Sequence, residues 1–186
     1  MIGKVYSAAV TGIYAVPVEV QADVAPGIPY FELTGNLAGT TKEAKERVRI
    51  AIKNSKFQIN PSKITINMIP ANIRKEGTSY DLAVAVAVLT AVGVIAAKKV
   101  SGALFIGELG LDGGICNVSS ILPMTLCARD NGFTICYVPM GNVGEASLVT
   151  GIRVIGISSL RECVDYINNG CNCRAHIDNN IDNLKT

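Results

Sequence analysis

The most apolar run of the chain covers residues 82–97 and constrains the fold more than any other feature. It is shorter than the roughly 20 residues that a membrane-spanning helix needs, and Lys98 and Lys99 follow it directly. Residues 83–88 alternate with the period of a strand, but the whole run is too long for one strand and Gly93 breaks it only late. The run therefore predicts a helix. A helix that is apolar on every side has to lie at the centre of its domain.

The composition indicates one packed α/β domain built mainly from small aliphatic side chains. Hydrophobic residues make up 49% of the 186 positions against 17% charged, and tryptophan is absent. The formal net charge of +2 gives no global field that would attract nucleic acid, so any basic surface has to be local. The first residues lack the apolar segment and cleavage site of an export signal, so we expect a cytoplasmic protein without membrane contact.

Strand and helix patterns alternate along the rest of the chain, as is typical of an α/β domain. Two Thr/Ser-x-x-Glu capping boxes mark helix starts, one at Thr40 and Glu43 and one at Ser159 and Glu162. The expected strands are 4–10, 13–20, 31–34, 63–69, 103–109, 115–118, 133–138 and 153–157. The expected helices, besides the central one, are 42–55, 120–130, 143–149 and 159–169. We assign residues 1–169 to the domain and 170–186 to a polar linker.

The cysteines indicate neither a disulfide framework nor a metal site. Those at positions 116, 127, 136 and 163 lie in apolar periodic segments and are expected to be free buried thiols. Cys171 and Cys173 lack the two-residue spacing of a zinc or redox pair, and the single histidine, His176, follows them alone. We therefore expect no metal ligands in this chain.

Ser79 follows a glycine turn at the start of the central helix, where a catalytic nucleophile is often presented. Free amides at a helix N-terminus favour an oxyanion. A catalytic triad would need His176 to return from the polar tail to Ser79 and Asp81, which the spacing does not support. A serine–lysine dyad would need a buried lysine as base, and Lys75 is too close along the chain to reach Ser79 easily.

Helix capping is the simpler interpretation of the same stretch. Thr78, Ser79 and Asp81 are all residue types that accept hydrogen bonds from the first free amides of a helix. From the residues alone we favour a cap over a nucleophile.

A basic helix is the other candidate functional feature. Residues 42–56 hold six lysines or arginines against two glutamates, a local charge of +4. Such a stripe is usually a solvated face, and contact with phosphates or with another subunit is the alternative. Residues 35–45 resemble a phosphate-binding loop only faintly, because Lys42 comes after both threonines instead of before them.

Three stretches of the chain resemble a known family in order and spacing. They are TKEAKERVRIAIKNSKFQINPSKITINMIPANIRKEGTSYDLAVAVAVLTA, LFIGELGLDGGICNVSSILPMTLCARDNGF and VPMGNVGEASLVTGIRVIGISSLRECVDYIN. Together they resemble the N-terminal domain of the magnesium-chelatase subunit I-like AAA+ ATPases, the ComM or YifB competence-protein family. The resemblance covers nearly all of residues 3–169.

This resemblance implies a fold class. We expect a two-layer mixed-sheet α/β domain with helices on one face, similar to the proteolytic domain of Lon protease. That superfamily also includes a ribosomal small-subunit protein and small-molecule kinases. It carries a left-handed βαβ crossover, which is rare among proteins and which residue patterns alone do not predict.

Similarity to Lon also bears on Ser79. Lon's catalytic serine follows a Lys-Asp-Gly-Pro run, and residues 75–78 place Ser79 at that position. The position of Lon's catalytic lysine falls on Leu122, and leucine cannot accept a proton. The resemblance therefore implies a noncatalytic domain in which Ser79 belongs to a pseudo-site. A peptidase that uses Ser79 with a non-standard base is the alternative.

The family role is ATP-driven branch migration of DNA by a hexamer during natural transformation. We expect the chain to belong to a longer protein whose AAA+ domain binds ATP and magnesium, and to need no cofactor of its own. Its partners would be that AAA+ domain, further copies of the protein and DNA. The candidates for nucleic-acid or subunit contact are Arg47, Arg49, Lys53 and Lys56.

Overall fold

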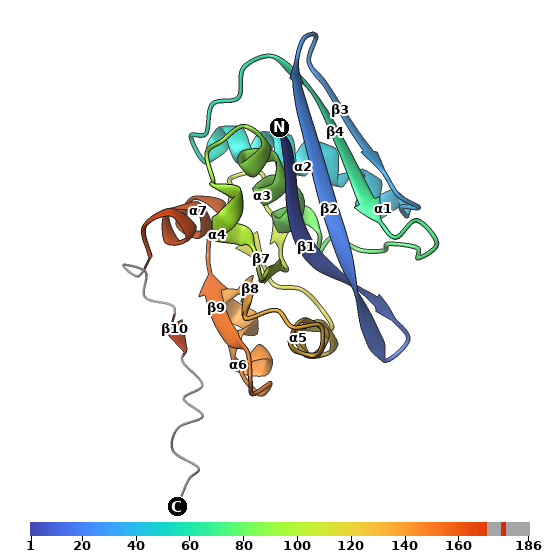
Figure 1. The fold of residues 1–186 in the computed structure, drawn as a ribbon, viewed down its shortest axis with the longest axis vertical. Coiled ribbons are helices and arrows are strands. Elements are labelled where there is room, and N and C mark those ends of the chain that lie inside the picture. Colours follow the sequence, from blue (N-terminus) through green and yellow to red (C-terminus); the bar gives the residue numbers. More distant parts are fainter. Residues whose placement is uncertain (171–175, 178–186) are drawn as a thin grey trace, which may run out of the picture.

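The computed structural model describes residues 1–170 and the backbone of residues 176–177. An eight-stranded sheet has the order β10-β9-β8-β5-β1-β2-β4-β3, and β6 and β7 form a separate pair (Figure 1). Its strands are β1 Ile2–Thr11, β2 Tyr14–Pro26, β3 Tyr30–Thr34, β4 Ser62–Ile69, β5 Ala103–Phe105, β8 Ile135–Pro139, β9 Arg153–Ile157 and β10 His176–Ile177. The small pair is β6 Glu108–Leu109 and β7 Ile115–Cys116.

The helices are short apart from four that have ten or eleven residues each. These four are α2 Ala44–Asn54, α3 Asp81–Ala91, α5 Ile121–Asp130 and α7 Leu160–Asn169. The shorter ones are α1 Gly39–Lys42, α4 Ala97–Val100, the 3-10 turn η1 Met140–Asn142 and α6 Val143–Ala146.

The larger part of the apolar run forms the central helix that the sequence predicts, and this helix ends at Ala91, before the run does. All eleven residues of α3 are buried, and α3 packs against β1 and β2. Gly3 on β1 permits this packing, because a Cβ built there would lie 2.1 Å from the carbonyl oxygen of Ala87. The backbone of strand and helix touch at this point, so the first strand and the central helix form one unit.

Helices cover both faces of the sheet where it contains β5, β8 and β9. Phe105 and Tyr137 pack into the core around α3, whereas the alternate residues Leu104, Cys136 and Val138 pack into a second core with residues of α5 and α6. The mixed sheet is as expected, but the prediction of helices on one face is wrong for this half. The reason is that these strands are apolar on both sides, and each apolar face needs a cover.

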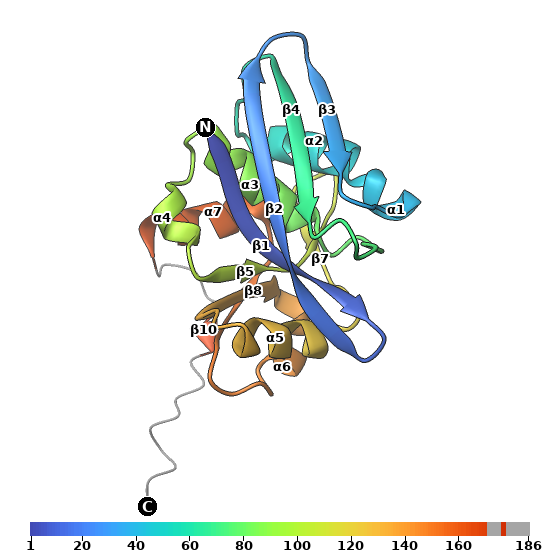
Figure 2. The ribbon, with the colours of Figure 1, turned by 45° about the vertical axis from the view of Figure 1, so that its right-hand side comes forward.

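The β3–α2–β4 unit contains a left-handed crossover. Strands β3 and β4 are parallel neighbours, with Phe31 opposite Ile64. In Figures 1 and 2 both strands run downward, β4 lies to the left of β3, and α2 lies behind them. That path has the opposite hand to almost all β-α-β connections. It places α2 and its basic residues beside β3, the last strand of the sheet.

One predicted capping box is present and the other is wrong. Ser159 Oγ accepts a hydrogen bond from the Glu162 amide at 3.1 Å, and Glu162 Oε2 accepts one from the Ser158 amide at 2.7 Å. At the start of α2, by contrast, Glu43 makes no side-chain cap. Thr40 Oγ1 accepts instead from the Gly77 amide at 3.3 Å, because a distant segment packs here and supplies the donor.

Other local predictions need adjustment. The expected 103–109/115–118 hairpin is divided, because β5 joins the main sheet and only β6 pairs with β7. The expected 143–149 helix is the single turn α6. Three of the four apolar-segment cysteines are buried free thiols, but Cys116 is exposed.

The predicted linker, residues 170–186, lies mostly outside the described residues, as do Cys171 and Cys173. Within the described part, Gly170 ends α7 and His176–Ile177 pairs with β9. The residues described include no helix with the length and apolar character to cross a membrane. They also include no group of three potential metal ligands.

Candidate functional site

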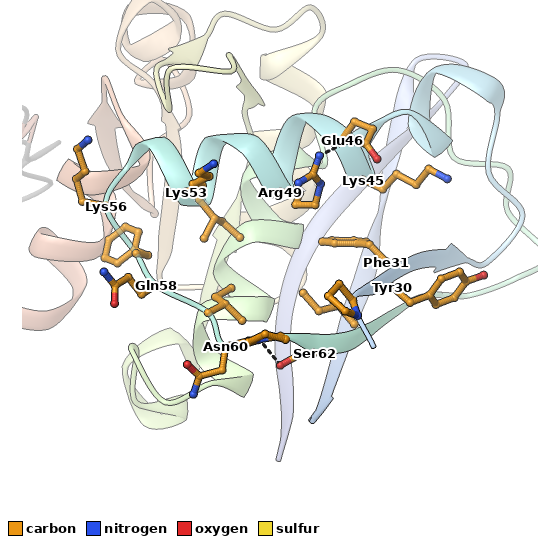
Figure 3. A pocket seen from close by; sticks show the side chains of 16 residues that line it. Tyr30, Phe31, Lys45, Glu46, Arg49, Lys53, Lys56, Gln58, Asn60 and Ser62 are labelled. Carbon is orange, nitrogen blue, oxygen red and sulfur yellow. Dashed lines mark hydrogen bonds and ion pairs between the residues drawn. The ribbon is translucent and has the colours of Figure 1, made fainter. Parts of the chain in front are cut away.

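A groove of about 960 Å³ lies between α2, the segment after it, and strands β3 and β4 (Figure 3). It is open along one side. Four cationic side chains, aromatic rings, side-chain amides and an apolar floor meet there, and they come from two stretches of the chain, residues 29–31 and 45–64. The lining residues are Pro29, Tyr30, Phe31, Lys45, Glu46, Arg49, Ile52, Lys53, Lys56, Phe57, Gln58, Ile59, Asn60, Pro61, Ser62 and Ile64.

The helical period of α2 separates its apolar residues from its charged ones. Its buried face carries Ala44, Val48, Ala51 and Ile52, which pack into the core. Residues 45, 49 and 53 are spaced four apart and are exposed, so their cationic side chains form one stripe along the groove. Three of the four contact candidates named from the sequence, Arg49, Lys53 and Lys56, line the groove, and Lys45 joins them.

The C-terminal end of α2 places Lys56 at the rim. The Phe57 amide donates to the Ile52 carbonyl and the Lys56 amide to the Lys53 carbonyl, which is the Schellman arrangement. Lys56 has φ +64°, the left-handed conformation that glycine usually supplies at this position. The chain therefore keeps a lysine at the rim where glycine would be easier to accommodate.

Most of the positive charge at the groove is unneutralised. Lys45, Lys53 and Lys56 form no ion pair or side-chain hydrogen bond with any described residue. Arg49 is paired with Glu46 at 2.9 Å, but both side chains are more than half exposed, at 58% and 59%. Exposed pairs of this kind are weak, so Arg49 is open to competition by an anion.

Arg47, the fourth candidate, points away from the groove. Its Nε and Nη2 donate to Asp81 Oδ2 and Oδ1 at 2.7 and 3.0 Å. Burial raises the pKa of the Asp81 carboxyl, Arg47 opposes that rise, and the hydrogen bonds to Asp81 raise the pKa of Arg47. The pair joins α2 to α3 instead of presenting a cation to a ligand.

Ser79 lies half-buried in the turn before α3. Its hydroxyl has no hydrogen-bond partner among the described residues, while its backbone carbonyl accepts from the Gly107 amide at 2.9 Å. The neighbouring Thr78 hydroxyl donates to Glu108 Oε2. The cap interpretation is wrong, because the N-cap of α3 is Tyr80 and makes no side-chain cap. Backbone carbonyls of Thr78 and Gly107 accept from the first amides instead.

Lys75, which the sequence places too close to Ser79 to act easily as its base, is a fully buried lysine. Its ammonium donates to the backbone carbonyls of Gly35 at 2.7 Å, Met68 at 3.3 Å and Pro70. Burial lowers the pKa of this ammonium. The three carbonyls, and no hydroxyl, are its partners, so Lys75 is not in contact with Ser79. The sequence gives no sign of this burial, because Lys75 is a charged residue between two exposed neighbours.

Leu122 lies in the first turn of α5 and packs, partly buried, against the second core. It occupies the position expected from the resemblance to carry the base, and its side chain contributes to packing.

The groove and the mixed sheet define an α/β domain with a basic surface at the sheet edge. The family of subunit ChlI of Mg-chelatase matches residues 20–142, and the chain belongs to this family. It is 33% identical over 164 residues to the competence protein ComM of Haemophilus influenzae, covering 88% of this chain and 32% of that protein.

Two further relatives are similarly close. YifB of Escherichia coli is 36% identical over 147 residues, which cover 79% of this chain and 29% of that protein. The uncharacterized protein Rv2897c of Mycobacterium tuberculosis is 35% identical over 166 residues, which cover 89% of this chain and 33% of that protein. The chain thus spans about a third of the length of the curated relatives it matches.

Proposed function

We propose that this chain is a noncatalytic Lon-like domain that contacts DNA within a ComM-type AAA+ protein. The observation that carries the proposal is the groove, where the ammonium groups of Lys45, Lys53 and Lys56 stand without a carboxylate partner among the described residues. Phosphates are the ligands that such a row of cations attracts most strongly. In the whole protein, ATP and magnesium would be bound by the motor domain, and a cytoplasmic hexamer would move DNA branches.

The contacts around Ser79 support the noncatalytic part of the proposal. The residue at the expected position of the base is Leu122, and the buried ammonium nearest in sequence, Lys75, is held by three carbonyls. A serine hydroxyl needs a base within hydrogen-bond reach to become a nucleophile. None of the described side chains makes that contact with the hydroxyl of Ser79.

A charge-reversal experiment tests the DNA contact. The 186-residue chain is titrated against fluorescein-labelled DNA, and anisotropy is followed between 50 and 200 mM salt, a range in which phosphate contacts weaken steeply. Replacing both Lys53 and Lys56 by glutamate should lower affinity at least about tenfold and make the salt dependence shallower, because two phosphate contacts are lost.

The matched control reverses the same amount of charge away from the groove. Lys98 and Lys99 on α4 are outside the groove lining, and replacing both by glutamate should change affinity less than about twofold. Equal losses from the two double variants would mean that only net charge matters. That result, or unchanged binding after the groove variant, would remove the groove from the proposal.

A further inference from the structure

The two rims of the groove differ in chemistry. Figure 3 shows Lys45, Arg49, Lys53 and Lys56 following one another along the α2 side, and the amides of residues 58 and 60 on the opposite side with Ser62. The side-chain amides of Gln58 and Asn60 are exposed and have no hydrogen-bond partner among the described residues. One rim suits anions, and the other offers both hydrogen-bond donors and acceptors.

Between the rims the groove has an apolar floor with accessible ring area. Phe31 lies between α2 and the strand edge, and Ile52 and Ile64 are buried beneath the groove. Tyr30, the neighbour of Phe31 on β3, is 53% exposed, but its side chain lies on the other face of the strand, where the Lys63 ammonium is 5.9 Å from its ring centroid. Phe57 is less available, because the Arg161 guanidinium already lies 4.9 Å from its ring centroid. Phe31 is therefore the ring that a ligand in the groove would meet.

A duplex would make little contact with an apolar floor of this kind. Its base faces are stacked on each other, and a rigid double helix presents mainly phosphates to a rim of lysines. Single strands expose both phosphates and base faces, and proteins bind them with a cationic groove that carries aromatic side chains. The amide rim adds partners for base edges, which a duplex would keep paired.

We propose that this groove binds a single nucleic-acid strand, with its phosphates along the lysines of α2 and its bases over Phe31 toward the amides of Gln58 and Asn60. This inference rests on the proposed function and specifies its ligand. The groove of about 960 Å³ is at the upper end of the size range of ligand pockets, which suits more than one base. An acidic peptide would satisfy the lysines but would leave the Phe31 ring without a planar partner.

The test separates ring contacts from charge contacts. Two labelled probes are titrated at the same salt concentration: an oligothymidylate, which forms no pairs with itself, and a hairpin duplex with the same number of phosphates. Replacing Phe31 by leucine should weaken binding of the oligothymidylate by about tenfold or more. Binding of the duplex should change less than about twofold. The Lys53→Glu and Lys56→Glu pair should weaken both.

Two controls protect the test from effects on folding. Tyr14 at the tip of the β1–β2 hairpin is 72% exposed and is not a groove residue, so Tyr14→Ser should leave both affinities unchanged. Tyr30→Ser removes an exposed ring from the outward face of the strand that carries Phe31, and it should likewise leave both affinities unchanged. Thermal unfolding of each variant identifies any that has lost its fold.

The possible outcomes separate this inference from the proposed function. If the duplex and the oligothymidylate bind equally and the Phe31 variant has no effect, the single-strand inference is overturned while the DNA contact stands. If neither probe binds, both the single-strand inference and the DNA contact are overturned. If polyglutamate displaces the oligothymidylate at equal charge concentration and its own binding needs Phe31, the ligand is an acidic peptide and the inference is overturned. Photocrosslinks from 5-iodouracil to Phe31 would support the inference, and crosslinks only outside the groove would contradict it.

Discussion

The Arg47 guanidinium lies against the Asp81 carboxylate in a two-point contact, with nitrogen–oxygen distances of 2.7 and 3.0 Å. Only 1% of the Asp81 side chain is exposed, and its Oδ2 also accepts from the Leu109 amide at 3.2 Å. Three elements, α2, α3 and β6, thus meet at one carboxylate. The position of the groove helix is fixed by this buried pair as well as by its apolar face.

Replacing Arg47 by leucine should lower the free energy of unfolding by about 3 kcal/mol, because Asp81 would be left charged, buried and without its cation. Urea unfolding followed by circular dichroism measures the change. Arg49→Leu is the matched control on the same helix, and it should cost less than about 1 kcal/mol because the Arg49–Glu46 pair is exposed. Adding Asp81→Asn to Arg47→Leu should recover part of the loss. Equal effects of the two arginine variants would contradict the structural role of Arg47.

Lys56 offers a substitution in which stability and binding change in opposite directions. Lys56→Gly should raise the free energy of unfolding by about 1 kcal/mol, because glycine adopts the left-handed conformation without a steric cost. The melting temperature should rise by about 2 to 4 °C. DNA affinity should fall, because one rim cation is lost. Lys56→Ala removes the same charge and keeps the strained backbone, so it should weaken binding without the gain in stability. A loss of stability in Lys56→Gly would show that the lysine side chain has a packing role at the helix end.

The buried ammonium of Lys75 predicts a pH dependence of stability. Burial lowers its pKa from the ordinary value of 10.5, so in the window between the lowered pKa and 10.5 the unfolded chain binds more protons than the folded one. Stability contributed by this residue should therefore rise with pH across that window, because the cost of burying a charge disappears. The measurement is urea unfolding of the native protein and of Lys75→Met from pH 8 upward. The difference between the two should move in favour of the native protein. A decrease with pH would mean that the three carbonyls stabilise the ammonium more than burial penalises it.

Ser79 should not react as a peptidase nucleophile. A serine-directed fluorophosphonate at excess should give no stoichiometric adduct by intact-mass spectrometry, because the hydroxyl has no base in contact among the described residues. Ser79→Ala should change the free energy of unfolding by less than about 0.5 kcal/mol, since no hydrogen bond is lost. A single adduct that disappears in Ser79→Ala would establish the peptidase alternative.

Features that depend on local periodicity could be predicted from the sequence. The run 82–97 predicts a buried central helix because no face of it is polar, and Asp81–Ala91 forms that helix; the α2 stripe follows from cations spaced along one helix. The capping box at Ser159 formed as predicted, although the distant residues Gly113 and Ile115 bond the backbone on either side of it. At Thr40 the hydroxyl itself bonds a distant segment, so the same motif makes a different contact.

Features that depend on which distant segments meet were missed. The groove needs β3, α2 and the loop before β4 to lie together, and the hand of their crossover decides that arrangement. The sequence predicts Arg47 to be a surface cation, because its buried partner, Asp81, is 34 positions away along the chain. The sequence separates Lys75 from Ser79, but it gives no sign that the Lys75 ammonium binds the carbonyls of Gly35, Met68 and Pro70.

The strand order has a consequence for how the chain folds during synthesis. β1 pairs along one edge with β2, which follows it immediately, but its other edge pairs in parallel with β5, where Tyr6 lies opposite Leu104. Ribosomes add about 5 to 20 residues per second, so roughly 100 residues of delay leave that edge open for about 5 to 20 s. During this interval the nascent β1–β2 hairpin presents unpaired backbone and an uncovered apolar face. The free edge of β1 therefore closes only after residue 105 has left the ribosome.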